Sequence, residues 1–322
     1  PTLPKRLELT PAIVKTRPLA TLVVLVLVVL LGATPASGDD EGRAMPRKSA
    51  AEKAGGGGEG ITSTIVVPAY KEKPNIRPLT ERLFSALSKE GMDKTTELLI
   101  VDDNSRDGSV EMVEELQKEG FPIRIHVRTN ERGLSSAVLK GFELAKGERL
   151  VCMDGDLQHP PEKVPEFLRA LSKSDYVLGT RYGEGFAVDK DWPLYRVIIS
   201  KGARMLARPL TSLSDPMSGF FGVTKRALSA GKGKVSPVGF KIGLEVYVKT
   251  GVEKHAEVQI FFAKREAGES KLTGKVMLYY LVHLSELYRF RFPLLIPSIA
   301  LLALVLLLSV IRLLSRTKPK VA

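Results

Sequence analysis

The sequence lacks a second cysteine, an internal repeat and any nucleic-acid recognition motif. Its 322 residues contain one cysteine, Cys152, which excludes an intramolecular disulfide. Because Cys152 stands within an apolar run, we expect a buried thiol in a domain that folds in a reducing compartment. The hydrophobic share of 44% excludes a disordered or fibrous chain and suffices for one large or two ordinary domains.

The charge balance is strongly basic. Lysine and arginine outnumber aspartate and glutamate by 48 to 36, which gives a formal charge of +12. A basic surface favours anionic partners such as nucleotides, phosphates or acidic lipid. The basic residues are dispersed along the chain, so nucleic acid is not an expected partner.

A hydrophobic run near the C-terminus predicts a membrane anchor. Residues 292–311 read FPLLIPSIALLALVLLLSVI, carry no charge and match the ~20 residues that a helix needs to cross a bilayer. The stretch before them mixes tyrosine, phenylalanine and arginine, which suits the lipid headgroup layer. We therefore expect an interfacial helix at 276–291 and a transmembrane anchor at 292–314. The alternative is a helix that packs on the domain core.

The N-terminal extension, residues 1–60, contains a shorter hydrophobic run. Residues 19–31 follow basic residues and precede GATPASG, a layout typical of a signal peptide or a short signal anchor. Met45 opens a polar stretch, so residues 1–44 are alternatively sequence upstream of the functional chain. The glycine-rich segment that ends in GGGGEG predicts a flexible linker up to residue 60.

Residues 61–275 predict one α/β domain, because short apolar runs alternate there with helical patterns. The apolar runs lie at 64–68, 97–101, 123–127, 149–153 and 175–179. The helical patterns lie near 75–90, 108–119, 134–146 and 161–173. Such alternation indicates βαβ units, in which helices cover a mainly parallel sheet. Ligands bind these sheets at the carboxyl ends of the strands, and polar residues follow all five runs.

The most informative strand end is MDGDLQHPPE, residues 153–162. On an extended segment Asp154 and Asp156 point the same way, and Gly155 lets a ligand approach the backbone closely. Two carboxylates with room for phosphate oxygens suit Mg²⁺ or Mn²⁺, and Gln158 can add a neutral oxygen. The stretch contains no lysine or arginine to balance the pair. It therefore predicts a divalent metal site, although a lone D-x-D is also typical of a solvated turn.

Two nearby positions are open to more than one interpretation. In VDDNSRDGS we expect Asp103 to bind a base or ribose and Asp102 only to cap, while residues 104–108 supply the turn before the next helix. His159 precedes two prolines that fix a helix start. We favour a structural or solvent-facing imidazole over a catalytic one.

Later segments add positive charge. The loop KREAGESKLTG, residues 264–274, contains Arg265 and Lys271, which can close over a diphosphate and neutralise a leaving group. A charge run is also typical of a solvated surface. Residues 195–210 have apolar residues at helical spacing interspersed with basic ones, which predicts a helix near a membrane and a phosphate. The segment SDPMSGFFG, residues 214–222, can shape an acceptor site.

The motifs together resemble a known family. In order they are VVPAYKEK, VDDNSRDGS, RTNERGLSSAVLKGF, VCMDGDLQHPPE, LGTRY, DKDWPLYR, SDPMSGFFG and GESKL. Through them, residues 64 to 291 resemble the inverting GT-A glycosyltransferases of family 2, specifically the dolichol-phosphate mannosyltransferases with one C-terminal membrane anchor. The resemblance implies a GT-A fold, which is a Rossmann-like mixed, mainly parallel sheet flanked by helices, plus a C-terminal transmembrane helix.

The resemblance also implies an activity. Family members transfer mannose from GDP-mannose to dolichyl phosphate, with inversion, on the cytosolic face of the endoplasmic reticulum membrane, for glycoprotein and GPI-anchor synthesis. Because a cytosolic catalytic domain does not follow a cleaved signal peptide, we expect residues 1–44 to be a noncleaved anchor or a non-native leader. A polyprenyl-phosphate glycosyltransferase that uses UDP-glucose and a noncatalytic membrane-tethered nucleotide-sugar sensor are the alternatives. The sequence leaves open whether small membrane subunits join the chain.

Site residues carry over by position. The resemblance implies a metal, Mg²⁺ or Mn²⁺, on Asp154, Asp156 and Gln158, and catalytic roles for Asp156, Arg265 and Lys271. It implies donor contacts at Pro68, Tyr70, Glu72, Val101, Asp103, Asp154, Gly155, Asp156, Arg181, Arg265 and Lys271. Two departures are Gly155, where alanine is common, and Gln259, which replaces a usual proline.

Overall fold

The computed structural model describes residues 60–182, 194–236, 241–261 and 274–316. The chain divides into two compact units, of which one spans residues 49–291 and the other includes the C-terminal segment from Phe292 onward. Each unit is described by itself.

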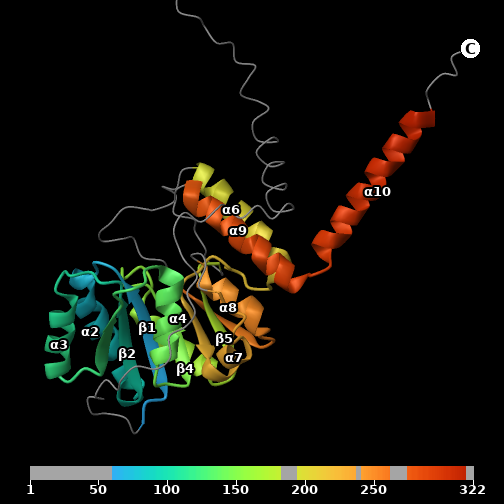
Figure 1. Cartoon of the computed structure of the whole chain (residues 1–322). Coiled ribbons are helices and arrows are strands. Elements are labelled where there is room, and N and C mark those ends of the chain that lie inside the picture. Colours follow the sequence, from blue (N-terminus) through green and yellow to red (C-terminus); the bar gives the residue numbers. More distant parts are fainter. Residues whose placement is uncertain (1–59, 183–193, 237–240, 262–273, 317–322) are drawn as a thin grey trace, which may run out of the picture. The chain divides into compact units, whose positions relative to one another are not determined.

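The larger unit is built on a seven-stranded sheet with the order β3-β2-β1-β4-β6-β5-β7 (Figure 1). Its strands are β1 Ser63–Ala69, β2 Thr96–Asp102, β3 Ile123–Val127, β4 Arg149–Cys152, β5 Tyr176–Thr180, β6 Phe221–Thr224 and β7 His255–Gln259. Only β6 runs antiparallel to its neighbours, β4 and β5, and all other pairs in this sheet are parallel. The predicted α/β fold with a mixed, mainly parallel sheet is therefore confirmed.

Helices cover both faces of the sheet. On one face lie α2 Lys73–Lys89, α3 Ser109–Lys118 and α5 Val164–Leu171, whose apolar residues pack with Ile65 and Val67. On the other face lie α4 Leu134–Leu144, α7 Lys225–Ala230 and α8 Ile242–Thr250, which pack with Val66. Successive residues of β1 thus point to opposite faces, as the period of a strand requires. Both faces are buried, which explains why the parallel strands read as continuous apolar runs.

The predicted core thiol and helix start are confirmed. Cys152 is buried in the same apolar cluster as Val66, and burial raises the pKa of its thiol well above its usual value. Pro161 begins a short 3₁₀ helix, Pro161–Lys163, that leads directly into α5. Proline suits this position because its fixed φ is already helical and its missing N–H is not needed there.

A buried carboxylate joins the amino-terminal ends of several strands through hydrogen bonds. Glu97 on β2 accepts hydrogen bonds from the Thr64 hydroxyl at 2.7 Å, the Arg124 Nε at 2.8 Å and the Lys146 N–H at 2.8 Å. Burial raises the pKa of Glu97, but the hydrogen bonds from Arg124, Lys146 and Thr64 outweigh it, and the net pKa is lowered. One ionised side chain thus joins β1, β2, β3 and the segment before β4.

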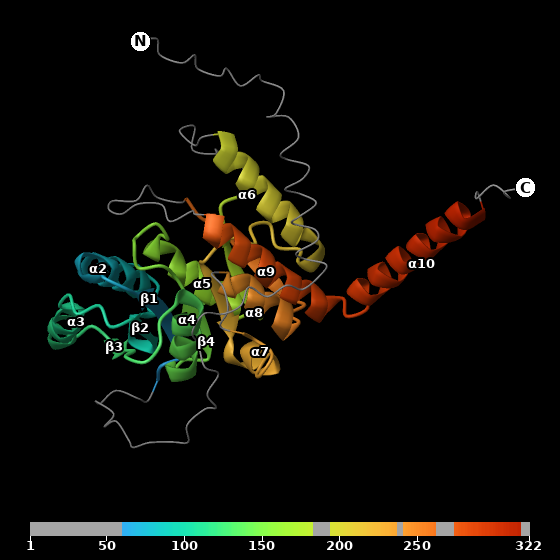
Figure 2. The same ribbon diagram turned by 45° about the horizontal axis from the view of Figure 1, so that its top comes forward.

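Two further helices lie beside each other at the carboxyl end of the sheet, α6 Leu194–Ala207 and α9 Gly274–Arg291 (Figures 1 and 2). The Tyr280 hydroxyl donates to the Ala203 carbonyl at 2.7 Å, and the Tyr288 hydroxyl donates to the Leu206 carbonyl at 2.8 Å. A helix was expected at each place, and both are present. The position of α9 at a membrane stays a prediction.

The second unit contains α10, Leu295–Arg316, a helix of 22 residues. Its described leucines are half exposed, with Leu304 at 51% and Leu307 at 56%. Within the part of the chain that the structure describes, no helix meets the length and hydropathy needed to cross a membrane.

The Glu97 contacts predict a pH-dependent loss of stability on substitution. Glu97→Gln removes the ionised, buried partner of a half-buried Arg124, so we expect a loss of about 2 kcal/mol at pH 7. The stabilisation by an acid of lowered pKa is complete above its unfolded pKa and is lost as pH falls through the folded value. The difference between wild type and variant should therefore shrink below pH ~4.3.

Thermal unfolding of the detergent-solubilised full chain measures this effect, with a Tm lower by roughly 4–8 °C at pH 7. Glu148→Gln, an exposed glutamate at the same edge of the sheet, is the matched control. Equal Tm values for Glu97→Gln and Glu148→Gln would contradict the assigned role.

Candidate functional site

The candidate site lies at the carboxyl ends of β1, β2, β4 and β5, as the sequence predicts. The loops that leave these strands are joined to one another. The Asp103 N–H donates to the Ala69 carbonyl at 3.0 Å, and the Lys71 N–H donates to the Ser105 hydroxyl at 2.8 Å. The segment from 68 to 72 is therefore held against the end of β2.

The aspartate pair follows β4 directly. Asp154, Asp156 and Gln158 are half-buried, whereas Gly155, Leu157 and His159 between them are buried, so the three polar side chains alternate with inward-facing residues. The Gln158 N–H donates to Asp156 Oδ1 at 3.2 Å, and Leu157 has a left-handed φ of 60°. The turn thus keeps the polar side chains toward one partly open side.

Gly155 brings this turn close to the first loop. A Cβ at Gly155 would lie 3.2 Å from Val67 Cγ1 and 3.7 Å from Glu72 Cγ. Glu72 itself accepts a hydrogen bond from Asn75 Nδ2 at 2.6 Å. Glu72 and Gly155, both predicted to contact GDP-mannose, are far apart in sequence but are therefore neighbours in space. An alanine at position 155 would require only a small shift of Val67.

His159 holds this turn in place through a hydrogen bond and a ring contact. Its Nδ1 accepts the Asp154 N–H at 3.0 Å, and its ring stacks on Phe220 with a centroid distance of 5.1 Å. Burial lowers the pKa of His159, although Asp154 and Asp156 act to raise it. An accepting Nδ1 carries no proton, so the 3.6 Å approach of Asp154 Oδ2 to this nitrogen is not a charge pair. The structural role expected for His159 is confirmed.

The aspartate pair, Asp154 and Asp156, fits a divalent ion that also binds phosphate oxygens. The Asp154 side chain is 40% exposed, and a Cβ at Gly219 would approach both of its oxygens to 3.6 Å, so this glycine leaves space beside the carboxylate. No cluster of three or more His, Cys, Asp or Glu side chains that could hold a metal occurs among the described residues. Two carboxylates with open positions match the way proteins hold Mg²⁺, which keeps waters and takes substrate phosphates.

A buried ion pair borders the aspartates. Arg181, just after β5, donates from Nε to Asp215 Oδ2 at 2.7 Å and from its terminal nitrogen to Oδ1 at 2.9 Å. The Asp215 side chain is 1% exposed and that of Arg181 is 22% exposed. Burial lowers the pKa of Arg181, but the hydrogen bonds to Asp215 outweigh burial, and the net pKa is raised. The guanidinium is therefore charged and fixed in direction.

Lys241 is a site residue that the sequence reasoning missed. Its Nζ donates to the Met217 carbonyl at 2.9 Å. Burial and Arg181 lower the pKa of its amine and outweigh Asp154 and Asp215, which raise it, so the net pKa is lowered. The only sequence signal is a lysine directly before an apolar helix, KIGLEVYV.

The predicted nucleotide half of the site is formed by β1 and β2. Pro68 pairs with Val101 in the sheet register, and Val101 is fully buried, so a contact between Val101 and a nucleotide stays a prediction. Tyr70 is 44% exposed, with Arg132 Cζ 5.4 Å from its ring centroid.

The two aspartates after β2 have different surroundings. Asp102 accepts the Ser105 N–H at 2.8 Å, so it stabilises the turn and does not cap α3; the N–H of Ser109, the first residue of α3, bonds to Asp107 instead. Asp103 forms a buried ion pair with Arg128, and its Oδ2 accepts the Gly133 N–H at 2.8 Å. A carboxylate has acceptor capacity beyond these bonds, so binding by Asp103 stays a prediction. Arg265 and Lys271 lie outside the described residues.

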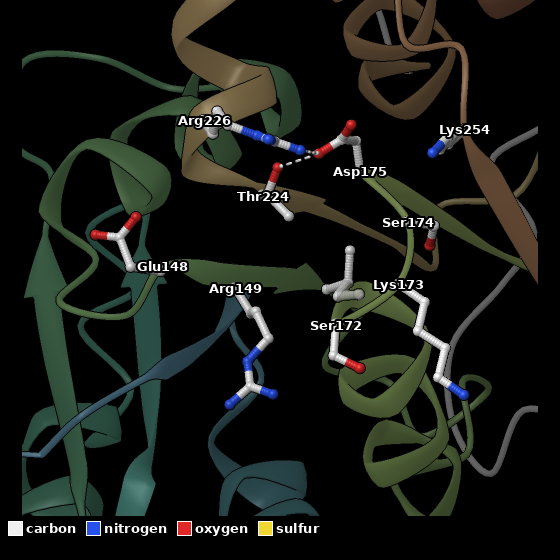
Figure 3. A pocket seen from close by; sticks show the side chains of 10 residues that line it. Glu148, Arg149, Ser172, Lys173, Ser174, Asp175, Thr224, Arg226 and Lys254 are labelled. Atoms are coloured by element: carbon white, nitrogen blue, oxygen red, sulfur yellow. Dashed lines mark hydrogen bonds and ion pairs between the residues drawn. The ribbon is translucent and has the colours of Figure 1, made fainter.

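A separate cavity of about 320 Å³ lies at the opposite end of the strands (Figure 3). Asp175 in its wall accepts from Arg226 at 2.6 Å and from the Thr224 hydroxyl at 3.2 Å. None of the predicted site residues lines it. The cavity is therefore distinct from the site at the carboxyl ends.

Comparisons with known proteins identify the family. The model for "Glycosyl transferase family 2" matches residues 64–231. A dolichol-phosphate mannosyltransferase from Mycosarcoma maydis is 57% identical over 251 residues, which cover 76% of this chain and 85% of the relative. One from Saccharomyces cerevisiae is 56% identical over 238 residues, which cover 72% and 89%.

Solved structures of low identity are also similar. A mannosyltransferase from Pyrobaculum calidifontis in complex with GDP-Man and Mn²⁺ is 16% identical, with a TM-score of 0.47. The match covers 81% of this chain and 82% of the solved chain. The sequence matches alone decide the family. The chain belongs to glycosyl transferase family 2 and, within it, to the dolichol-phosphate mannosyltransferases.

Proposed function

We propose that the chain transfers mannose from GDP-mannose to dolichyl phosphate with inversion at the anomeric carbon. The observation that carries this proposal is the identity of 57% and 56% to two dolichol-phosphate mannosyltransferases, over 85% and 89% of their lengths. The position of Asp154, Asp156 and Arg181 at the carboxyl ends of β4 and β5 supports this proposal. The donor would lie over the ends of β1, β2 and β4, with its sugar toward β5.

Asp154 and Asp156, with the Gln158 oxygen, would hold Mg²⁺ or Mn²⁺. When bound, the ion would stabilise the negative charge that grows on the departing diphosphate. The half-buried position of both carboxylates supports this role. Asp156, Arg265 and Lys271 would be the catalytic residues, the two cations by neutralising the leaving group.

The acceptor does not require a general base. A phosphate monoester with a second pKa of ~6 is largely a dianion at pH 7, so the protein must chiefly position it. The state of His159 supports this view, because its Nδ1 is already bonded to the Asp154 N–H and its pKa is lowered by burial. The fixed Arg181 guanidinium would orient anionic groups near the transferred sugar.

We further propose that α10 anchors the chain in the endoplasmic reticulum membrane, with the catalytic unit on the cytosolic face and α9 in the headgroup layer. The uncharged run at 292–311 supports an anchor, and α10 has 22 residues, or ~33 Å of helix against ~30 Å of hydrocarbon. Exposed Phe290 and Phe292, at 43% and 37%, support a boundary position.

The donor and acceptor can be tested with membranes that contain the full chain. Radiolabelled mannose from GDP-mannose should appear in a dolichyl-phosphate product whose anomeric configuration is opposite to that of the donor. Preference for UDP-glucose would favour the polyprenyl-phosphate glucosyltransferase. Binding of the donor without any lipid-linked sugar would favour the noncatalytic sensor.

Removal of the metal ligands should abolish transfer. Asp154→Ala and Asp156→Ala should each lower kcat/KM by at least about a hundredfold, since an interaction made mainly in the transition state is lost. EDTA should stop the wild-type reaction, and added Mn²⁺ should restore it. Asp93→Ala is the control, because Asp93 is an acid in the short 3₁₀ helix Asp93–Thr95, outside the site. Near-normal, EDTA-sensitive transfer by Asp154→Ala would contradict the assignment.

The anchor and its orientation can be tested by an N-glycosylation acceptor tag fused after Ala322. None of the chain's own asparagines is followed by the N-x-S/T acceptor pattern, so any modification reports the tag. A spanning helix with a cytosolic catalytic unit should bring the tag into the lumen, where it is glycosylated. Leu304→Arg with Leu307→Arg should prevent this, because each charge at mid-helix costs ~2.5–3.5 kcal/mol. A wild-type tag that stays unmodified and protease-sensitive would reject the proposed anchor.

A further inference from the structure

The strands β1, β2 and β3 end level with one another at the nucleotide half of the site. Ala69 pairs with Asp102, and Asp102 pairs with Val127, so the last residues of the three strands are neighbours across the sheet. Because the sheet order is β3-β2-β1, the loops after β1 and β3 flank the end of β2 from its two sides. A ligand over the end of β2 therefore lies between these two loops.

The loop after β3 is held in shape by a buried arginine. The Arg128 side chain pairs with Asp103, and its guanidinium donates to the Gly133 carbonyl at 2.9 Å. The Gly133 N–H in turn donates to Asp103 Oδ2 at 2.8 Å. Both ends of the loop are thus fixed to the residue that follows β2, while residues 129–132 between them are exposed.

Arg132 in this loop reaches the loop after β1. Its Cζ lies 5.4 Å from the ring centroid of Tyr70, the first residue after β1, so the two loops meet across the end of β2. The ring face attracts the guanidinium and keeps it near this place. In the part of the chain that the structure describes, the Arg132 guanidinium has no hydrogen bond or ion pair. Its N–H donors are therefore available to a ligand, whereas Arg128 is held by Asp103 and Gly133.

The sheet order decides which part of a nucleotide reaches Arg132. Asp154 and Asp156 follow β4, and β1 and β2 lie between β4 and β3. Three strand spacings of ~4.8 Å amount to about 14 Å, a distance that an extended nucleoside diphosphate can cover. A ligand with its diphosphate at Asp154 and Asp156 therefore brings its base, rather than its ribose, to the loop after β3.

We propose that Arg132 determines the specificity for the base, because its guanidinium donates to O6 and N7 of guanine. The inference rests on the proposed donor, GDP-mannose. Two N–H groups of an arginine match these two adjacent acceptors, and the same pairing is the commonest specific contact to guanine in DNA. In uracil, O4 is flanked by N3–H and C5–H, so this base offers the guanidinium one acceptor instead of two.

Lys71 is the other cation near the Tyr70 ring, with its Nζ 5.5 Å from the centroid. It belongs to the loop after β1, and β1 is the strand that pairs with β4. Lys71 therefore lies nearer to the phosphate end of the ligand than Arg132 does. It is a matched control, since it is also exposed and its replacement removes the same charge beside the same ring.

Calorimetry of the full chain in detergent with Mn²⁺ tests the contact through GDP, UDP and 7-deaza-GDP, in which a C–H group replaces N7. Wild type should bind 7-deaza-GDP about fivefold more weakly than GDP, because one hydrogen bond to a charged donor is lost. Arg132→Met should bind GDP about tenfold more weakly than wild type does, and should bind GDP and 7-deaza-GDP equally. Its preference for GDP over UDP should fall by about tenfold.

The kinetics of transfer give a second measurement. The base is remote from the anomeric carbon, so a contact to it is equally strong in the ground state and the transition state. Arg132→Met should therefore raise the KM for GDP-mannose about tenfold and leave kcat nearly unchanged. Lys71→Met should keep the wild-type ratio of GDP to 7-deaza-GDP affinity.

The outcomes separate this inference from the proposed function. An equal loss of affinity for GDP, UDP and 7-deaza-GDP in Arg132→Met would indicate a phosphate contact, and no loss would indicate packing on Tyr70 alone. Either result would overturn the role of Arg132 in base specificity and leave the function standing. A wild type that binds UDP more tightly than GDP would overturn the proposed donor as well.

Discussion

The arrangement of the site depends on the buried ion pair between Arg181 and Asp215. Arg181 follows β5, and Asp215 precedes the antiparallel strand β6, so their two hydrogen bonds join the ends of neighbouring strands. The turn after Asp215 then carries the Met217 carbonyl to Lys241 and the Gly219 backbone to Asp154. Because one partner without the other would leave a buried charge unpaired, each of these positions depends on both residues.

Charge in this region is balanced between elements rather than within them. The aspartate stretch after β4 contains no basic residue, and the cations that act on His159 beside it, Arg181 and Lys241, come from the end of β5 and the start of α8. Asp103 after β2 is likewise paired with Arg128 after β3. A group of like charges in sequence is thus divided among partners that only the folded sheet brings near. The same is true at the amino-terminal ends of the strands, where Glu97 accepts hydrogen bonds from three segments of the chain.

The sequence predicted the parts of this fold that depend on local pattern. Parallel strands buried on both faces read as apolar runs, and for this reason β1 to β5 were found within a residue or two of their observed bounds. Strand β6 was missed although it is as long as β4, because it directly follows the Ser-Gly turn of SDPMSGFFG and its direction is set by pairing with β4 and β5. Lys241 was missed for a related reason. The acid near it in sequence, Glu245, pairs with Lys249 and His283 instead, and the neighbours of Lys241 in space arise only after the sheet has formed.

The hydroxyl contacts of α9 have a consequence for how α6 ends. The Leu206 carbonyl belongs to the last turn of α6, where carbonyls have no partner within the helix, and Tyr288 supplies a donor from the other helix. With Tyr280 bonded one turn earlier, α9 acts as an external cap. Arg204, between these two bonded positions, lies with its guanidinium 4.2 Å from the ring centroid of Tyr182, next to Arg181. A displacement of α9 would therefore fray the end of α6 before it altered the sheet, and that end carries Arg204, which contacts Tyr182 beside the ion pair.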